Sequence, residues 1–439
     1  MDSQTSRKSK QVAASLILLS ELLLCALGGM AKGQATEPTS QVTAAQEIST
    51  LTNQGQSLME KGDYATAQPL LERALAVAEK IYGTEDIRTA LPLLAVATLY
   101  YVQEDYARAE PLYRRVLAID EKAFGPEHPI IASALDSLGM TLKARGDYAQ
   151  AESVFQRALA IKEKANGAED PGLMLFLNNL AETYLAQGAY AQAEPLFQRA
   201  LSIREKASGP EHPSVAASLI NLASYHQTKK DYAKAEQLLQ RALAIDEKVL
   251  GAEHPDVVTP LNNLAILYYE KGELDRVEPL IRRALSIREK IFGAEHPNTA
   301  LLVNDLAALL EAKGNYAEAE HLYQRALSIF EKTLGPEHPH LIILLTNLAG
   351  LYLAMNENAK ALAMFTRANE ARERNLSLIL TTGSEQQKQL YMATITGETD
   401  TTVSLHLRSV PNDAQAARLA LTTLLRRKGR VLDVMSNQI

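Results

Sequence analysis

The stretch Gly188–Pro213, GAYAQAEPLFQRALSIREKASGPEHP, returns along the chain with a fixed period. The glycines that end successive copies stand 42 residues apart: Gly167, Gly209, Gly251, Gly293 and Gly335. A repeat of roughly 20–50 residues is the signature of a stacked array, in which each unit buries one face against its neighbours. The 439-residue chain therefore needs no single large core, and the period sets its fold.

The composition favours helices and excludes several classes of site. Ala and Leu are abundant, aromatic residues make up 5% of the chain and Trp is absent, so helical propensity exceeds strand propensity. The net charge of −7 comes from interleaved acidic and basic residues, unlike the basic footprint of a nucleic-acid-binding protein. The single cysteine, Cys25, leaves the rest of the chain without a disulfide, a thiolate metal site or a cysteine nucleophile.

Each copy carries the signals for two helices and a turn. In the copy after Gly209, Pro213 suits the first helical position, and apolar residues of 213–228 recur at three- and four-residue steps. The polar residue of the turn that follows is a predicted N-cap of the second helix: Asp63, Asp105, Asp147, Asp231 and Asn315. The second helix is expected to end at the glycine, which accepts a left-handed conformation.

Small and large residues alternate in both helices. We expect Ala181, Ala193 and Ala200 where the helices approach closely, with Tyr184 and Phe197 filling the space between. The pattern Leu-Ala-x-x-Tyr, then Ala-x-x-x-Phe-x-x-Ala, resembles the tetratricopeptide repeat. With the Gly-x-Glu-His-Pro loop, it is similar to the repeats of kinesin light chains and their bacterial relatives. The resemblance implies an all-α, right-handed superhelical solenoid of about eight helix hairpins over residues 44–380.

The N-terminal region has the order of an export signal. Basic residues, the apolar run Val12–Gly29 and then small residues predict a signal peptide over residues 1–35, cleaved after Ala31 or Ala35. Glu21 interrupts the run, and the alternative is an uncleaved helix that anchors the chain in a membrane. Residues 36–43 are predicted to be a linker. We therefore expect an exported protein, periplasmic or secreted, or one tethered to a membrane by its N-terminus.

The period stops after Arg374, and residues 381–439 form a C-terminal extension. Its phrase Leu425–Asp433, LRRKGRVLD, resembles the connector before the peptidase domain in proteins that join these repeats to a caspase-like CHAT domain. The resemblance implies a truncated connector and, as a partner, a CHAT-type peptidase domain. That family uses a Cys–His pair, and no cysteine follows Cys25, so no protease activity is implied here.

Two periodic series look like chemistry. Five histidines occupy equivalent loops, but equivalent residues stand roughly 10 Å apart, too far to share one ion, so we expect them to stabilise the loops: His128, His212, His254, His296 and His338. An arginine recurs in the second helix of every copy: Arg73, Arg115, Arg157, Arg199, Arg241, Arg283, Arg325 and Arg367. We expect these to pair with a glutamate of a neighbouring repeat; the alternative is a positive rail for an acidic ligand.

A third series of polar residues lies on the first helices. The candidate peptide-binding residues are Asn178, Asn179, Glu182, Asn221, Asn262, Asn263, Asn304, Asp305 and Asn347. Asn is a poor helix former, so we expect a reason beyond the fold for its repetition. A primary amide both donates and accepts, and a spacing of ~10 Å matches about three residues of extended chain. These side chains could therefore hold a peptide backbone, in the groove that tetratricopeptide arrays line with their first helices; the alternative is a solvated polar face.

The sequence thus predicts a scaffold that binds protein or peptide partners in a concave groove through a ladder of asparagines. The alternative is the regulatory part of a split or truncated CHAT-type peptidase. No nucleophile–base pair, phosphate loop or metal spacing is left once periodic residues are discounted, so we expect no enzyme activity, cofactor or metal. We expect no nucleic-acid partner, and contact with a membrane only through the N-terminus.

Overall fold

The computed structural model describes residues 39–60, 63–333 and 339–382. Within these ranges the chain is all-α, and its helices are paired into tetratricopeptide-type hairpins, as the repeat predicts. The predicted signal or anchor over 1–35, the connector over 381–439 and the phrase at Leu425–Asp433 lie outside the described residues, apart from the end of the last helix. Among the described helices, none has the length and apolar character needed to span a bilayer.

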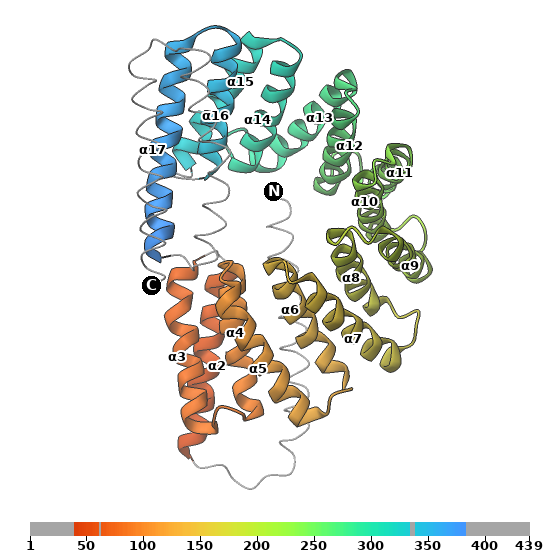
Figure 1. Ribbon diagram of the computed structural model, residues 1–439, viewed down its shortest axis with the longest axis vertical. Helices are drawn as coiled ribbons and strands as arrows, with labels where there is room; N and C mark the ends of the chain where they lie inside the picture. The colour runs from red at the N-terminus through yellow and green to blue at the C-terminus, as the bar shows by residue number, and fades with distance from the viewer. Residues whose placement is uncertain (1–38, 61–62, 334–338, 383–439) are drawn as a thin grey trace. The chain divides into compact units, whose positions relative to one another are not determined.

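The chain divides into two compact units, the first of which ends at Pro210. Its described part holds four hairpins, each made of a first helix and a second helix (Figure 1). The helices are α2 (Thr39–Glu60), α3 (Tyr64–Tyr82), α4 (Ile87–Val102), α5 (Tyr106–Phe124), α6 (Pro129–Arg145), α7 (Tyr148–Asn166), α8 (Met174–Ala186) and α9 (Tyr190–Ser208). The 3₁₀ turn η2 (Pro171–Leu173) leads into α8. Helix α2 begins at Thr39, inside the segment predicted to be a linker.

The second unit begins at Glu211 and also contains four hairpins in its described part. Its helices are α10 (Pro213–Thr228), α11 (Tyr232–Leu250), α12 (Val258–Glu270), α13 (Leu274–Phe292), α14 (Pro297–Ala312), α15 (Tyr316–Thr333), α16 (Pro339–Ala354) and α17 (Asn358–Thr382). The 3₁₀ turn η3 (Pro255–Val257) leads into α12. Within each unit, a second helix packs on its own first helix and on the first helix of the next hairpin.

The predicted turn chemistry is largely confirmed. Asp63, Asp105 and Asp231 each accept a hydrogen bond from the backbone N–H three residues later, at 3.2, 3.2 and 3.4 Å. Asp147 occupies the same place without such a bond. The loop glycines have φ from 87° to 96° with extended ψ, for example 91° and 160° at Gly167, so only glycine fits there comfortably.

The core of each hairpin is a seam between small and large side chains. Ala181, Ala193 and Ala200 are buried, as expected, with Phe197 beside them in the sequence pattern. A close approach occurs at Gly139, where an added Cβ atom would lie 2.6 Å from the ring of Phe155. From α4 onwards the first helices contribute most of the buried side chains, and each of them leaves only a narrow accessible face.

Candidate functional site

The accessible face of a first helix is one stripe of residues three or four apart. In α14 the residues Ala300, Leu302, Val303, Leu306 and Ala307 are all buried. The positions between them remain accessible and form the stripe: Leu301, Asn304, Asp305, Ala308, Glu311 and Ala312. This periodicity follows from 3.6 residues per turn, with most of the circumference covered by neighbouring helices.

The other first helices of the second unit show the same register. We call these accessible residues the open stripes. In α10 they are Ala217, Asn221, Ser224, Gln227 and Thr228; in α12 they are Thr259, Asn262, Asn263, Ile266, Tyr269 and Glu270; in α16 they are Ile343, Thr346, Asn347, Gly350, Leu353 and Ala354. In the first unit, the open stripe of α8 consists of Leu175, Asn178, Glu182, Leu185 and Ala186.

Three predicted site residues have uncommitted amides. The side chains of Asn178, Asn221 and Asn262 are half-buried, and within the described ranges none of the three has a hydrogen-bond partner. Their donors and acceptors are therefore available on the open stripes. Glu182 is exposed as well, and its Oε2 atom accepts from the Lys143 Nζ atom at 2.7 Å.

Other predicted site residues are engaged within the chain. Asn347 Nδ2 donates to Asn304 Oδ1 at 3.1 Å, which links two consecutive first helices. Asn263 Nδ2 donates to the carbonyl of Thr259 at 2.9 Å, one turn earlier in its own helix. Asn304 Nδ2 lies 3.4 Å from Oδ1 of the exposed Asp305.

For Asn179, the expectation that a polar residue is present for a reason beyond the fold is wrong. Its side chain is 2% exposed, and its Nδ2 atom donates to Asp136 Oδ1 at 2.7 Å. Asp136 is buried too, and burial raises the pKa of its carboxyl to about 6 although the Asn179 bond opposes the rise. This buried pair joins α6 to α8 and takes Asn179 off the open stripe.

The arginine series pairs within the array, as predicted. Arg325 Nη2 donates to Glu289 Oε1 at 2.6 Å and to the carbonyl of Ala294 at 3.1 Å, both in the preceding repeat. The same pairing with a glutamate of the repeat before recurs at Arg115, Arg157, Arg199, Arg283 and Arg367, whereas Arg73 pairs with Glu47 of its own hairpin. A second row of more exposed ion pairs runs beside it, such as Lys122–Glu85 and Lys248–Glu211, both at 2.7 Å.

The loop histidines stabilise their loops, as predicted, and they do so by capping the helix or 3₁₀ turn that follows. Nδ1 of His212 accepts from the backbone N–H of Ser214 at 3.1 Å, and Nδ1 of His296 accepts from that of Asn298, also at 3.1 Å. His128 and His254 make the same bond at 3.3 Å, while His338 lies outside the described residues. Over the described ranges, no cluster of three or more His, Cys, Asp or Glu residues could hold a metal ion.

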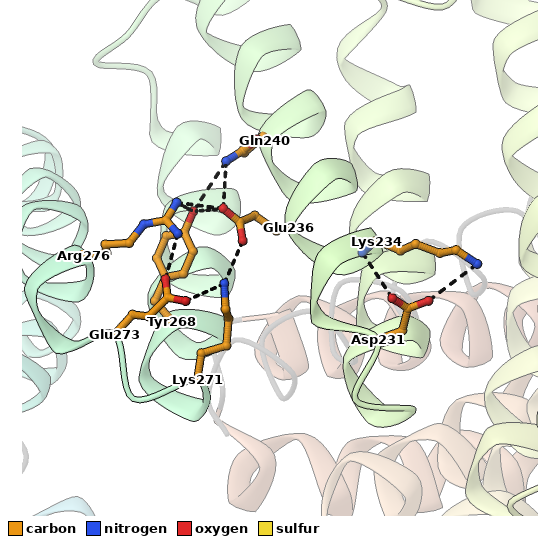
Figure 2. Close-up of polar contacts among 8 residues, drawn as sticks. All are labelled: Asp231, Lys234, Glu236, Gln240, Tyr268, Lys271, Glu273 and Arg276. Atoms are coloured by element: carbon orange, nitrogen blue, oxygen red, sulfur yellow. Dashed lines mark hydrogen bonds and ion pairs between the residues drawn. The ribbon is translucent and has the colours of Figure 1, made fainter.

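The most densely bonded polar cluster surrounds Glu236 at the junction of two repeats (Figure 2). Its carboxylate accepts from Lys271 at 3.0 Å, from Arg276 at 2.7 Å and from the Tyr268 hydroxyl at 2.9 Å. Burial alone would raise the pKa of Glu236, but the bonds from Arg276, Lys271 and Tyr268 lower it to about 2. Lys271, at the end of α12, also pairs with Glu273 at 2.7 Å, so this cation is committed to the array.

Sequence reasoning missed a buried acid in the second helices. Asp120 is 0% exposed, and neither of its carboxylate oxygens has a hydrogen-bond partner within the described residues. Burial raises the pKa of Asp120 to about 7. The equivalent positions of the next two repeats hold Lys162 and Arg204, whose long side chains can reach towards solvent where a short aspartate cannot. An aspartate at a position that holds a long basic side chain in the next two repeats was the sequence signal that could have identified this buried acid.

Comparisons with known proteins show what this architecture resembles. No curated protein matches the chain. Among solved structures, nearly identical TPR-like repeats from Podosopora anserina, described as those of a kinesin light chain, are 25% identical over 47% of this chain and 97% of their own, with a TM-score of 0.43. BtubC (BKLC) from P. vanneervenii is 25% identical over 54% of this chain and 92% of its own, with a TM-score of 0.43. Both are distant similarities.

A third structure, the apo form of the quorum sensor NprR from B. thuringiensis, is 14% identical over 86% of this chain and 99% of its own, with a TM-score of 0.50. It is similar in fold alone. The tetratricopeptide repeat family model matches residues 46–122, 90–164, 173–248, 224–290 and 298–374, together well over half of the sequence. The repeat register, the paired helices and this match agree: the chain belongs to the tetratricopeptide repeat family, whose members generally bind proteins.

Proposed function

We propose that the protein is a scaffold that holds extended peptide segments of partner proteins along its open stripes. One observation carries the proposal: the first helices α8, α10, α12, α14 and α16 bury nearly everything except an accessible stripe, and asparagine recurs on that stripe. A peptide needs donors and acceptors at intervals, and the amides of Asn221 and Asn262, which make no hydrogen bond within the described residues, offer both on two successive first helices, one position apart in the repeat.

The spacing supports an extended ligand. Neighbouring repeats stand ~10 Å apart, which corresponds to about three residues of extended chain at ~3.3 Å each. Amides that bind a backbone impose little side-chain selectivity, so selectivity must come from the other residues of the open stripes. No catalytic step, cofactor or metal belongs to this proposal.

The test is a cross-linked pull-down from native extract with a double variant, Asn221→Ala with Asn262→Ala. The control is Asn166→Ala with Gln237→Ala, two amide side chains that are exposed on second helices, outside the open stripes. We expect the first variant to lose most of its captured partner while the control retains it. Equal capture by both variants, each folded by circular dichroism, would remove the amides from the binding mechanism.

Two further proposals rest on sequence alone. The order of basic, apolar and small residues before residue 36 supports export or membrane tethering, which fractionation of the native cells would test. The phrase Leu425–Asp433 supports the alternative function as the regulatory part of a CHAT-type peptidase. Absence of a caspase-like domain, in frame or adjacent, from the downstream DNA would eliminate that alternative.

A further inference from the structure

Exposed large apolar side chains gather on two open stripes of the second unit. Ile266 and Tyr269 on α12 are 53% and 54% exposed, and Ile343 on α16 is 55% exposed. Ile266 and Tyr269 are three residues apart in one helix, so they project from the same face. Single exposed apolar residues are ordinary, whereas several on the open stripes of nearby first helices mark a contact surface.

The stripe between them is acidic. On α14, the repeat between α12 and α16, Asp305 is exposed and Glu311 is half-buried. Glu270, exposed at the end of α12, adds a third carboxylate. The open stripes of α12, α14 and α16 contain no Lys or Arg to neutralise these charges, and the half-buried His340 lies one turn before Ile343 on α16.

The nearest cations are bound elsewhere in the array. Lys271 pairs with Glu236 and Glu273, at 3.0 and 2.7 Å. Lys313, at the end of α14, pairs with Glu278 at 2.7 Å and with Asp275 at 3.1 Å. These two lysines therefore do not neutralise the negative charge of the stripes. That charge favours a cationic group on a ligand that lies between the two apolar sites.

We propose that the open stripes of α12, α14 and α16 select a partner peptide whose side chains run apolar, basic, apolar at intervals of about three residues. The inference rests on the proposed function and names its ligand class. One apolar side chain lies against Ile266 and Tyr269, a Lys or Arg lies against Asp305, and a second apolar side chain lies against Ile343. The interval follows from ~10 Å between repeats and ~3.3 Å per extended residue.

The experiment uses three fluorescein-labelled nine-residue peptides of serine with two leucines, at the second and eighth positions. The fifth position is lysine, glutamate or serine. Fluorescence polarisation with the full chain is expected to rank lysine first and glutamate last, with about a fivefold or greater difference in Kd between them that shrinks in high salt. Equal affinities for the lysine and glutamate peptides would overturn the assigned charge selectivity.

Matched variants locate the site. Glu270→Gln with Asp305→Asn should remove most of the preference for lysine. Glu370→Gln with Asp256→Asn removes the same two charges from exposed positions outside these stripes and should leave the preference unchanged. If both double variants lost the preference for lysine equally, the preference would depend on the net charge of the protein, and the proposed site would be refuted.

A reporter gives an independent readout. With the only cysteine replaced, Cys25→Ser, an environment-sensitive dye can be attached at Ile266→Cys or at Val249→Cys. These positions are 53% and 51% exposed, and Val249 lies near the end of the second helix α11. The lysine peptide should change the dye signal at position 266 only; a similar change at 249 contradicts the assignment.

The outcomes separate the two proposals. If all three peptides bind alike and Asn221→Ala with Asn262→Ala weakens them all, the scaffold stands and the charge selectivity fails. If lysine is preferred and the asparagine variant binds normally, the selectivity stands and the amides have no role. If no peptide changes the signal at position 266, both proposals fail for this unit.

Discussion

Replacing Asp120 by asparagine should stabilise the first unit at neutral and alkaline pH. The carboxylate is completely buried, neither oxygen has a partner among the described residues, and burial raises its pKa from 3.8 to about 7. A group whose pKa is higher in the folded state contributes stability that is fully present below its unfolded pKa and is lost as the pH rises through its folded pKa. The loss therefore extends from about pH 4 to about pH 7.

The magnitude follows from the two pKa values. Each unit of pKa corresponds to about 1.4 kcal/mol, so a move from 3.8 to about 7 corresponds to an upper value of about 4 kcal/mol. Asparagine has nearly the same shape and no titration. The difference in unfolding free energy between Asp120→Asn and the wild type should therefore be small near pH 4 and reach about 2–4 kcal/mol in favour of the variant by pH 8.

The assay is urea denaturation of the full chain at several pH values, with hydrogen exchange of amides in α5 and α6. Stability in repeat arrays is local, so the effect should concentrate in these helices, which pack on each other. Asp120→Ala, which copies Ala78 of the preceding repeat, separates lost charge from lost shape. At Asp246, burial and then the charge of Asp256 raise the pKa to about 6, so Asp246→Asn should act in the same direction but less strongly. A pH-independent difference for Asp120→Asn, or a variant less stable at pH 8, would refute the reasoning.

Three further predictions use residues at contacts between helices. Arg325→Ala should lower the free energy of unfolding by about 1–2 kcal/mol, because the arginine donates to both a glutamate and a loop carbonyl. Lys332→Ala breaks only an exposed ion pair at 3.7 Å and should lower it by less than about 0.5 kcal/mol. Denaturant titration of both variants compares the two effects. Gly139→Ala should destabilise by about 1–3 kcal/mol, since its Cβ would overlap a buried ring, while Gly350→Ala, with its nearest contact at 3.9 Å, should be neutral or stabilising by up to about 1 kcal/mol in the same titration. The pKa of Glu236 is lowered to about 2, so the stabilisation that its carboxylate provides is present above the unfolded pKa of 4.5 and is lost as the pH falls through about 2. Glu236→Gln should therefore lower the free energy of unfolding at pH 7 by about 1–2 kcal/mol, and the stability of the variant should depend less on pH between 5 and 2. Identical acid-unfolding profiles for the variant and the wild type would contradict this prediction.

The period of 42 residues determined most of the local architecture. It placed the helix pairs, because each copy carries its own start, turn and stop signals, and the structure follows them at Asp63, Asp105 and Asp231. It also predicted that the arginines pair between repeats, as seen at Arg325. Such features depend on residues close in sequence or one period away, so a repeated sequence specifies them directly.

The tertiary structure decided which polar residues of the register are accessible. Asn179 and Asn221 are one period apart and identical in type, yet Asn179 is buried against Asp136 while Asn221 is half-buried with an uncommitted amide. Asp120 occupies the same register as Lys162 but is sealed from solvent. Accessibility depends on the residues that neighbouring helices place over each position, and those neighbours differ from repeat to repeat. The sequence therefore specified the stripe, while packing between repeats selected the side chains on it that a partner can reach.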